Sequence, residues 1–313
     1  MSARLSYRSY NDLIGTLKCA SDKIKGRFDM VLGVPRSGMV PAYLLALQHH
    51  LPVMDLETFI SGGRPSGGAR SGKFSTKKVA RILVVDDSIH FGAEMTKVRK
   101  KLGAFSGYDF TFMAVYGTEE SRGWVDICLE SIPAPRVFEW NIMYSWIYGY
   151  SCVDIDGVLC YDPTDEENDD GEKYRRFILN ARPKFIPQVK INSLVTARLE
   201  KYRKETEDWL QRQGIQYDNL YMLDLPDKET RVKLGNHGHF KASVYSSLKN
   251  AMLFIESDKK QAERIRNITN RPVFCADTFE YFAPVDHKQT LLHRGVRKAK
   301  RIFGNVNLKT SAW

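Results

Sequence analysis

Residues 79–87 read VARILVVDD, a nearly continuous apolar run that ends in two adjacent aspartates. A run of this length without helical periodicity predicts a strand buried on both faces of a parallel sheet. Three further segments have the same character: FDMVLGV (28–34), LPVMDLETFI (51–60) and DFTFMAVYG (109–117). Segments with helical spacing lie around and between them, at 6–25, 39–50 and 92–102. Strands that alternate with helices predict an α/β fold with a mostly parallel sheet.

The same alternation begins again near residue 150. Five more segments are predicted strands: SCVDIDGVL (151–159), KINSLVT (190–196), NLYMLDL (219–225), AMLFIES (251–257) and RPVFCA (271–276). A long helix is predicted at 197–214, where the pattern ends in a glycine typical of a C-cap. We therefore predict two α/β domains, at 1–147 and 148–285, each a mostly parallel sheet flanked by helices, and a basic tail at 286–313.

The composition is typical of a globular protein. Of the 313 residues, 43% are hydrophobic and 27% are charged. No run approaches the roughly 18–20 apolar residues of a membrane span, and the N-terminus has no apolar core of a signal peptide. We therefore expect a cytoplasmic protein without a membrane partner. The five cysteines form no CxxC pair, which argues against a disulfide framework or a zinc site.

The net charge of +10 is concentrated at the C-terminal end. Residues 287–313 contain seven Lys or Arg and no acidic residue. A tail of this kind either binds nucleic acid or is a solvated basic segment, and both interpretations stay open. The sequence does not indicate an oligomeric state.

The most specific motif is Asp154-Ile155-Asp156-Gly157, at the end of a predicted strand. Residues i and i+2 of a strand point to the same side, so the two carboxylates are expected to lie together. They repel each other unless a cation lies between them, which favours a Mg²⁺ site at the carboxyl edge of the sheet. Gly157 allows the chain to turn sharply beside a substrate.

With three further elements, this motif resembles the haloacid dehalogenase superfamily, whose phosphatases begin with DxDG. The further elements are LVTAR with Thr196, HFKAS with Lys241, and Glu256-Ser257-Asp258. Lys233 is a competing candidate for the family lysine. The resemblance covers about residues 150–281 and implies a Rossmann-like fold with a small cap insertion.

The resemblance also implies covalent catalysis. Asp154 attacks phosphorus, and Asp156 protonates the leaving oxygen and then activates water. Thr196 and Lys241 bind the phosphoryl oxygens. Mg²⁺ is the implied cofactor, and the implied ligands are Asp154, Asp156, Glu256 and Asp258.

A second motif follows the apolar run quoted first. Asp86 and Asp87 end the strand, and a short loop leads into a helix. Two adjacent carboxylates are able to accept hydrogen bonds from the 2′- and 3′-hydroxyls of a ribose. The backbone N–H groups of the loop and of the helix N-terminus suit a 5′-phosphate.

This arrangement resembles the type I phosphoribosyltransferases, which bind phosphoribosyl pyrophosphate (PRPP). The sequence GVPRSG (33–38) resembles their pyrophosphate loop, and the Gly-rich segment 62–73 resembles their closing loop, with Arg64, Arg70 or Lys73 as the basic residue. Family members usually have Ser or Thr where this chain has Ala93 and Glu94. The implied PRPP-binding residues are Arg36, Ser37, Gly38, Lys73, Asp86, Asp87, Ser88, Ile89, His90, Phe91, Gly92 and Ala93.

Three functions are consistent with these motifs. The first is a bifunctional enzyme that joins a base-like acceptor to PRPP and then hydrolyses the resulting phosphomonoester, giving a nucleoside-like product. The second is a Mg²⁺-dependent phosphatase that is regulated by a nucleotide-binding, catalytically inactive first domain. The third is a 3′-phosphatase associated with nucleic acid through the basic tail.

Overall fold

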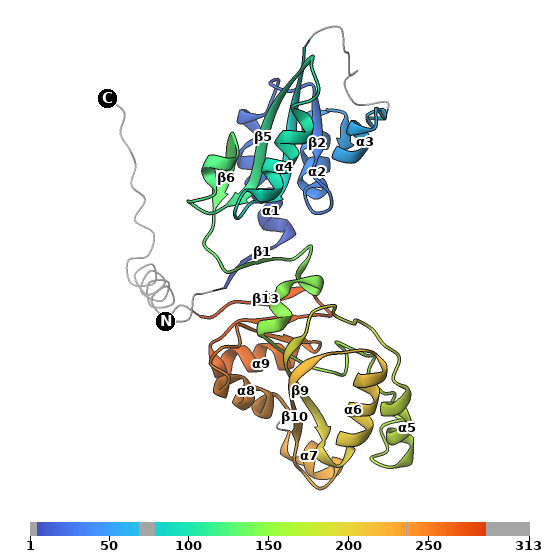
Figure 1. Cartoon of the computed structure of the whole chain (residues 1–313). Coiled ribbons are helices and arrows are strands. Elements are labelled where there is room, and N and C mark those ends of the chain that lie inside the picture. Colours follow the sequence, from blue (N-terminus) through green and yellow to red (C-terminus); the bar gives the residue numbers. More distant parts are fainter. Residues whose placement is uncertain (1–4, 69–78, 236, 286–313) are drawn as a thin grey trace, which may run out of the picture. The chain divides into compact units, whose positions relative to one another are not determined.

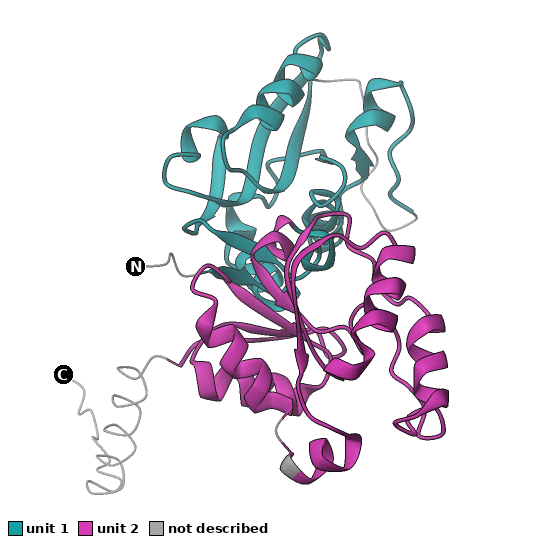
Figure 2. Ribbon diagram, turned by 60° about the horizontal axis from the view of Figure 1, so that its bottom comes forward, with its two compact units in different colours: residues 1–145 teal, residues 146–313 magenta. Residues whose placement is uncertain are grey.

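The computed structural model describes residues 5–68, 79–235 and 237–285, and these form two compact units. Unit 1 comprises residues 1–145 and unit 2 residues 146–313, so the division falls two residues before the predicted one (Figure 2). The basic tail at 286–313 and the segment 69–78 of the Gly-rich loop lie outside the described residues. No helix of the described part is long and apolar enough to cross a membrane.

Unit 1 contains a five-stranded sheet that is parallel, as the sequence predicts, although its edge strand β6 was not predicted (Figure 1). Its strands, in spatial order, are β3 (Val53–Asp55), β2 (Met30–Gly33), β4 (Ala80–Ser88), β5 (Tyr108–Gly117) and β6 (Ile127–Ser131). Its α-helices are α1 (Tyr10–Cys19), α2 (Met39–His49), α3 (Leu56–Ile60) and α4 (Ala93–Leu102). Short 3₁₀-helices lie at Ser21–Lys23, Arg122–Trp124 and Ile142–Tyr144.

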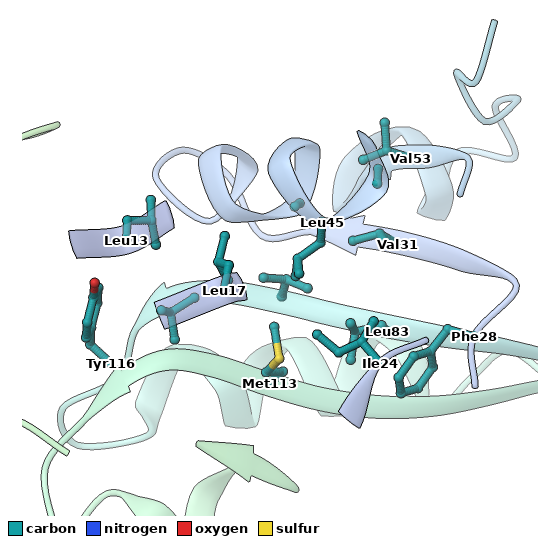
Figure 3. Packing of buried hydrophobic residues seen from close by; sticks show 14 of the residues in the cluster. Leu13, Leu17, Ile24, Phe28, Val31, Leu45, Val53, Leu83, Met113 and Tyr116 are labelled. Carbon is teal, nitrogen blue, oxygen red and sulfur yellow. The ribbon is translucent and has the colours of Figure 1, made fainter. Parts of the chain in front are cut away.

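Both faces of this sheet are buried, which explains the continuous apolar run of β4. Leu83 and Val85 face one cluster, to which α1 and α2 contribute Leu13 and Leu45 (Figure 3). Ile82 and Val84 face the opposite cluster, which contains the buried side chains of α4. Successive strand residues point to opposite faces, so a strand between two layers of helices is apolar at every position.

The predicted strand at 51–60 is wrong in its second half, because α3 begins at Leu56. Asp55 caps this helix: its carboxylate accepts a hydrogen bond from the Thr58 N–H at 2.9 Å. An aspartate that satisfies a free N–H of the first turn favours a helix start at this position.

A separate two-stranded parallel sheet joins the two ends of unit 1. Its strands are β1 (Ser6–Arg8) and β7 (Arg136–Phe138), and Ser6 pairs with Arg136. This pairing fixes the position of residues 136–140, which include two side chains of the second site described below.

Unit 2 contains a six-stranded sheet in which β13 alone is antiparallel to its neighbour. The spatial order is β10 (Tyr217–Leu223), β9 (Ile191–Leu199), β8 (Ser151–Val153), β11 (Leu253–Glu256), β12 (Val273–Cys275) and β13 (Glu280–Phe282). The helices are α5 (Glu172–Asn180), α6 (Arg203–Arg212), α7 (Lys228–Leu234), α8 (His237–Ser247) and α9 (Lys259–Thr269), with 3₁₀-helices at Trp146–Tyr150 and Glu200–Tyr202. Between β8 and β9 the chain forms a long excursion that contains α5.

The helix predicted at 197–214 starts later than expected. β9 continues to Leu199, and α6 begins at Arg203. The strand continues through Arg198 because this side chain is fully buried and forms an ion pair with Asp156.

Candidate functional sites

The first candidate site lies at the carboxyl ends of the central strands of unit 2. In the order β10-β9-β8-β11-β12, the chain adds β9 and β10 on one side of β8 and then β11 and β12 on the other side. Ligands of such sheets bind in the crevice at this switch point, between β8 and β11. Asp154 directly follows β8, Thr196 lies on β9, and Glu256 ends β11. A cavity of about 440 Å³ opens here, and five predicted site residues line it: Asp154, Asp156, Thr196, Lys241 and Asp258.

Lys241 connects the strand ends of this site. From α8, its Nζ donates to Asp154 Oδ2 at 2.6 Å, to Glu256 Oε2 at 2.7 Å and to Gln261 Oε1 at 3.2 Å. The side chain is only 2% exposed, whereas the competing Lys233 is exposed on α7. Burial raises the pKa of Asp154 well above its ordinary value; Lys241 opposes this effect, and Glu256 adds to it.

Asp156 has a different partner, Arg198, which the sequence analysis missed. The Nε of Arg198 lies 3.1 and 3.2 Å from the two Asp156 oxygens, and Nη2 donates to Oδ1 at 2.6 Å. Burial alone would raise the pKa of Asp156, but the charge of Arg198 and its hydrogen bonds lower it below the ordinary value. A signal for this contact was present, because Arg198 follows Thr196 by two positions and so faces the same side of β9.

Gly157 permits the turn that brings Asp156 into the cavity. Its φ is +75°, and a Cβ atom at this position would lie 2.2 Å from the Ser257 hydroxyl oxygen. Any other residue would therefore be strained and would also push the β8 and β11 loops apart.

The four predicted metal ligands do not converge on one point. Asp154 and Glu256 share Lys241, and Asp156 is bound by Arg198. Asp258 caps α9, where its carboxylate accepts from the Gln261 N–H at 2.7 Å. No three His, Cys, Asp or Glu side chains of the described residues come together as a complete metal site.

The charge of this cluster nevertheless fits a cation. Two buried carboxylates, Asp154 and Glu256, and the half-buried Asp156 face two buried cations, so one negative charge is uncompensated when all three are ionised. Asp154 and Asp258 both line the cavity, whereas Glu256 does not. Mg²⁺ usually binds through one or two carboxylates and keeps several waters, so this pair is sufficient for it.

The second candidate site lies at the corresponding position in unit 1. In the order β3-β2-β4-β5-β6, the chain adds β3 on one side of β2 and then β4 to β6 on the other side. Ligands of this sheet type bind at the switch point between β2 and β4. The loop that contains Arg36, Ser37 and Gly38 follows β2, and Asp86 and Asp87 lie at the end of β4. A Cβ atom at Gly38 would lie 2.5 Å from the Val34 carbonyl oxygen and 2.8 Å from that of Val85, so only glycine allows this loop to approach β4.

The two aspartates are tightly packed at this edge. Asp87 is 3% exposed, and its Oδ2 accepts a hydrogen bond from the Trp140 indole Nε1 at 2.6 Å. Burial and the neighbouring charge of Asp87 raise the pKa of Asp86 to about 8, and burial raises the pKa of Asp87 as well. Near neutral pH the pair therefore retains a proton, which allows it both to donate and to accept hydrogen bonds.

In the loop 88–93, Ile89 is buried but His90 and Phe91 point outward. The side chain of Phe91 is 77% exposed. Gly92 has a φ of +69°, and a Cβ atom here would lie 2.3 Å from the Trp124 ring. Helix α4 begins directly after it without a side-chain cap, so its first N–H groups have no side-chain acceptor.

Glu94 points away from this loop. Its side chain is 74% exposed and accepts a hydrogen bond from Lys97 Nζ at 2.6 Å. Its charge still contributes, as the smallest effect, to the raised pKa of Asp86.

Two residues that the sequence analysis missed hold this site, one on β7 and one just after it. Trp140 bonds Asp87, and the buried guanidinium of Arg136 donates to the Ile89 carbonyl. Nothing in the local pattern of residues 136–140 marks them, because their partners lie about 50 residues earlier. Of the three basic candidates in the Gly-rich loop, Arg64 is exposed, and Arg70 and Lys73 lie outside the described residues.

Among known proteins, this chain is similar to solved structures at low sequence identity. No protein-family model matches the chain, and no curated protein matches it. Among solved structures, the chain is similar to a purine phosphoribosyltransferase from Pyrococcus horikoshii, with 18% identity, a TM-score of 0.34, and coverage of 44% of this chain and 93% of that chain. It is also similar to the Helicobacter pylori xanthine-guanine-hypoxanthine phosphoribosyltransferase, with 18% identity, a TM-score of 0.36, and coverage of 44% and 95%.

Proposed function

We propose that unit 2 hydrolyses phosphomonoesters through an aspartyl-phosphate on Asp154. The observation that carries this proposal is the position of Lys241 Nζ between Asp154 and Glu256, at the switch point of the sheet. Asp154 Oδ1 accepts from the Ile155 N–H at 2.8 Å, and Oδ2 accepts from Lys241. Both oxygens are thus oriented, which supports an attack by the carboxylate on phosphorus.

The reaction proceeds in two halves. Asp154 forms a bond to phosphorus while the bond to the leaving oxygen breaks, and Asp156 supplies the proton for the leaving alcohol. Water then attacks the aspartyl-phosphate, Asp156 takes up the proton, and inorganic phosphate is released. Arg198 favours the ionised form of Asp156, which is the form that takes a proton from water in the second half. The protonated form that the first half needs is disfavoured, so expulsion of a weakly acidic alcohol is expected to be the slower half.

Asp154 and Asp258 would hold Mg²⁺ in this site. When bound, the ion supplies positive charge that favours ionised Asp154 and neutralises the phosphoryl oxygens. We expect EDTA to abolish phosphate release and added Mg²⁺ to restore it. Thermal unfolding gives a readout independent of activity: Mg²⁺ should raise the melting temperature of the parent and have a smaller effect on Asp258→Asn. Full activity in EDTA would show that the site needs no metal.

For unit 1 we propose binding of PRPP or a nucleotide. Asp86 and Asp87 would bind the ribose hydroxyls, the N–H groups of residues 88–93 the 5′-phosphate, and the loop 36–38 the pyrophosphate. The outward position of Glu94 supports this assignment, because its carboxylate does not occupy the phosphate loop. Transfer of the phosphoribosyl group to a base-like acceptor, with release of pyrophosphate, would give a product that keeps the 5′-phosphate of PRPP. This product is a phosphomonoester, the kind of substrate that unit 2 is proposed to hydrolyse.

The double variant Asp86→Asn/Asp87→Asn tests this assignment. Loss of the charge and of the carboxyl hydrogen bonds of this pair should weaken PRPP or nucleotide binding by about 100-fold, measured by calorimetry. Asp109→Asn, an exposed change on β5, is the matched control and should bind like the parent. Phosphate release by unit 2 should be equal in all three proteins. Unchanged affinity in the double variant would exclude the diol assignment.

A regulatory role for unit 1 is the second candidate. Ala93 offers no hydroxyl to a phosphate, and Trp124 packs directly against Gly92 at the start of α4, which favours binding without transfer. Release of pyrophosphate from PRPP and an acceptor distinguishes the two, because only the transferase produces it. The third function, a nucleic acid 3′-phosphatase, depends on the tail at 286–313, and salt-sensitive binding of nucleic acid would favour it.

Replacement of Glu94 by Thr is expected to leave PRPP affinity unchanged within about twofold. Glu94 is exposed and lies in the first turn of α4, where a negative charge stabilises the helix by a few tenths of a kcal/mol. Glu94→Thr should therefore lower the free energy of unfolding by about that amount, measured by urea denaturation. A large gain in PRPP affinity would instead mean that Glu94 opposes the ligand in solution.

A further inference from the structure

Arg231, on α7, is a cation of the unit 2 cavity that no described carboxylate neutralises. It lines the same cavity as Asp154 and Thr196. The other lining cation with a full charge, Lys241, is bound by Asp154 and Glu256. Arg231 forms no ion pair with any described residue, although five aspartates line the cavity: Asp154, Asp156, Asp162, Asp258 and Asp277.

The guanidinium of Arg231 is bonded to the strand end that carries Thr196. Its Nη1 donates to the Ala197 carbonyl at 3.1 Å, and Ala197 directly follows Thr196. Tyr174 also lines the cavity, and the charge of Arg231 acts on it: burial raises the pKa of the Tyr174 hydroxyl, and Arg231 opposes this rise. The Nε of Arg231 is buried and has no partner among the described residues. The side chain as a whole is half-buried and lines the cavity, so a ligand in the cavity is able to contact it.

The short helix α7 holds Arg231 firmly in this position. Asp227 caps the helix and accepts from the Thr230 N–H at 2.7 Å. The Lys228 N–H donates to Asp170 Oδ2 at 2.8 Å, and the Lys228 ammonium group bonds the Asn168 carbonyl. Helix α7 is thereby fixed to the loop whose Asn168 lines the same cavity. A side chain fixed before the ligand arrives loses little entropy on binding.

The cavity needs such a cation. A phosphomonoester brings about two negative charges into a space where aspartates outnumber basic residues. Like charges already interact here, because burial and the charges of Asp156 and Asp277 raise the pKa of Asp162. A guanidinium has a planar fork of donors that matches two phosphate oxygens, which a lysine does not provide.

We propose that Arg231 binds the oxygens of the phosphoryl group under attack, together with Thr196 and Lys241, and is a catalytic residue of unit 2. This inference rests on the proposed phosphatase function. It assigns the recognition of the phosphate dianion to a residue outside the motifs that suggested the function.

The test uses 4-nitrophenyl phosphate, which carries no anion except its phosphoryl group. Arg231→Ala should lower kcat/KM by about 100-fold, as loss of a donor to a developing charge does. Arg231→Lys keeps the charge but not the fork, and about a 10-fold loss is expected. Added guanidinium ion at a non-denaturing concentration should restore part of the activity of Arg231→Ala. The matched control, Lys233→Ala, removes an exposed charge from the same helix and should stay within about twofold of the parent.

The outcomes separate the two proposals. A parent protein that releases no phosphate refutes the phosphatase function itself. An active parent whose Arg231→Ala and Arg231→Lys variants both stay within about threefold in kcat/KM refutes the role of Arg231 alone. Should Arg231→Ala fail to fold, Arg231→Lys decides, because it retains the aliphatic stem and the charge. A loss in kcat/KM that guanidinium partly restores supports the proposal, since a purely structural defect would not respond to it.

Discussion

Asp154→Asn is expected to release phosphate from phosphomonoesters at least about 10³-fold more slowly than the parent. The amide keeps the shape of the side chain but is a far weaker nucleophile, and no other lining carboxylate has the same contact with Lys241. Release of inorganic phosphate, measured over a panel of phosphomonoesters with Mg²⁺ present, gives the result. Asp165→Asn, an exposed change outside the cavity, is the matched control and should match the parent.

The same variant tests the covalent intermediate. With 4-nitrophenyl phosphate, whose leaving group needs little protonation, the first half is fast, and acid-quenched parent protein should carry a phosphoryl group on the peptide that contains Asp154, whereas the variant should carry none. Undiminished phosphate release by Asp154→Asn would contradict the nucleophile assignment. Activity that is lost in the variant, with no phosphorylated peptide in the parent, would favour attack by water and leave Asp154 as a residue that only positions it.

Lys241→Met is expected to lower the free energy of unfolding by about 3–5 kcal/mol at pH 7. The change leaves Asp154 and Glu256 buried without their shared cation. Urea denaturation is the measurement, with the exposed Lys249→Met as the control. The double variant Lys241→Met/Glu256→Gln removes one of the two buried charges that have lost their cation, and it should recover a substantial part of the lost free energy of unfolding.

The pH dependence of this loss has a definite sign. Burial raises the pKa of Asp154, so the folded state binds its proton more tightly than the unfolded state. A group of this kind favours folding at low pH and opposes it as the pH rises through its folded pKa. Without Lys241 this opposition increases, and the difference between variant and parent should be largest near neutral pH and shrink toward pH 4. A difference that grows on acidification would contradict the assignment.

The fold was predictable from periodicity wherever a strand is buried on both faces. The run at 79–87 gives β4 almost residue for residue, because both layers of helices impose apolar side chains on it. Residues 56–60 were assigned wrongly because an apolar run does not distinguish a strand from a short helix. The capping aspartate at position 55 was the local signal that decides between them.

The candidate sites were predictable only in part. Residues next to strand ends could be placed, since the carboxyl ends of parallel strands meet at one edge. The pairing of charges could not, because it depends on contacts between distant segments. The sequence shows four carboxylates that suit a metal, but not that Lys241 and Arg198 bind three of them. Arg231 could not be placed for the same reason, because α7 is held at the cavity by hydrogen bonds to residues about 60 positions earlier.

The pairing of β1 with β7 has a consequence for biosynthesis. Ser6 pairs with Arg136, so β1 is able to pair only after the ribosome has added a further 130 residues. Contacts of such long sequence separation form late in folding. Arg136 and Trp140 are the residues that hold the loop 88–93 and Asp87. A nascent chain released between residues 131 and 140 would therefore contain every strand of the main sheet of unit 1 and still lack the Trp140 contact with Asp87.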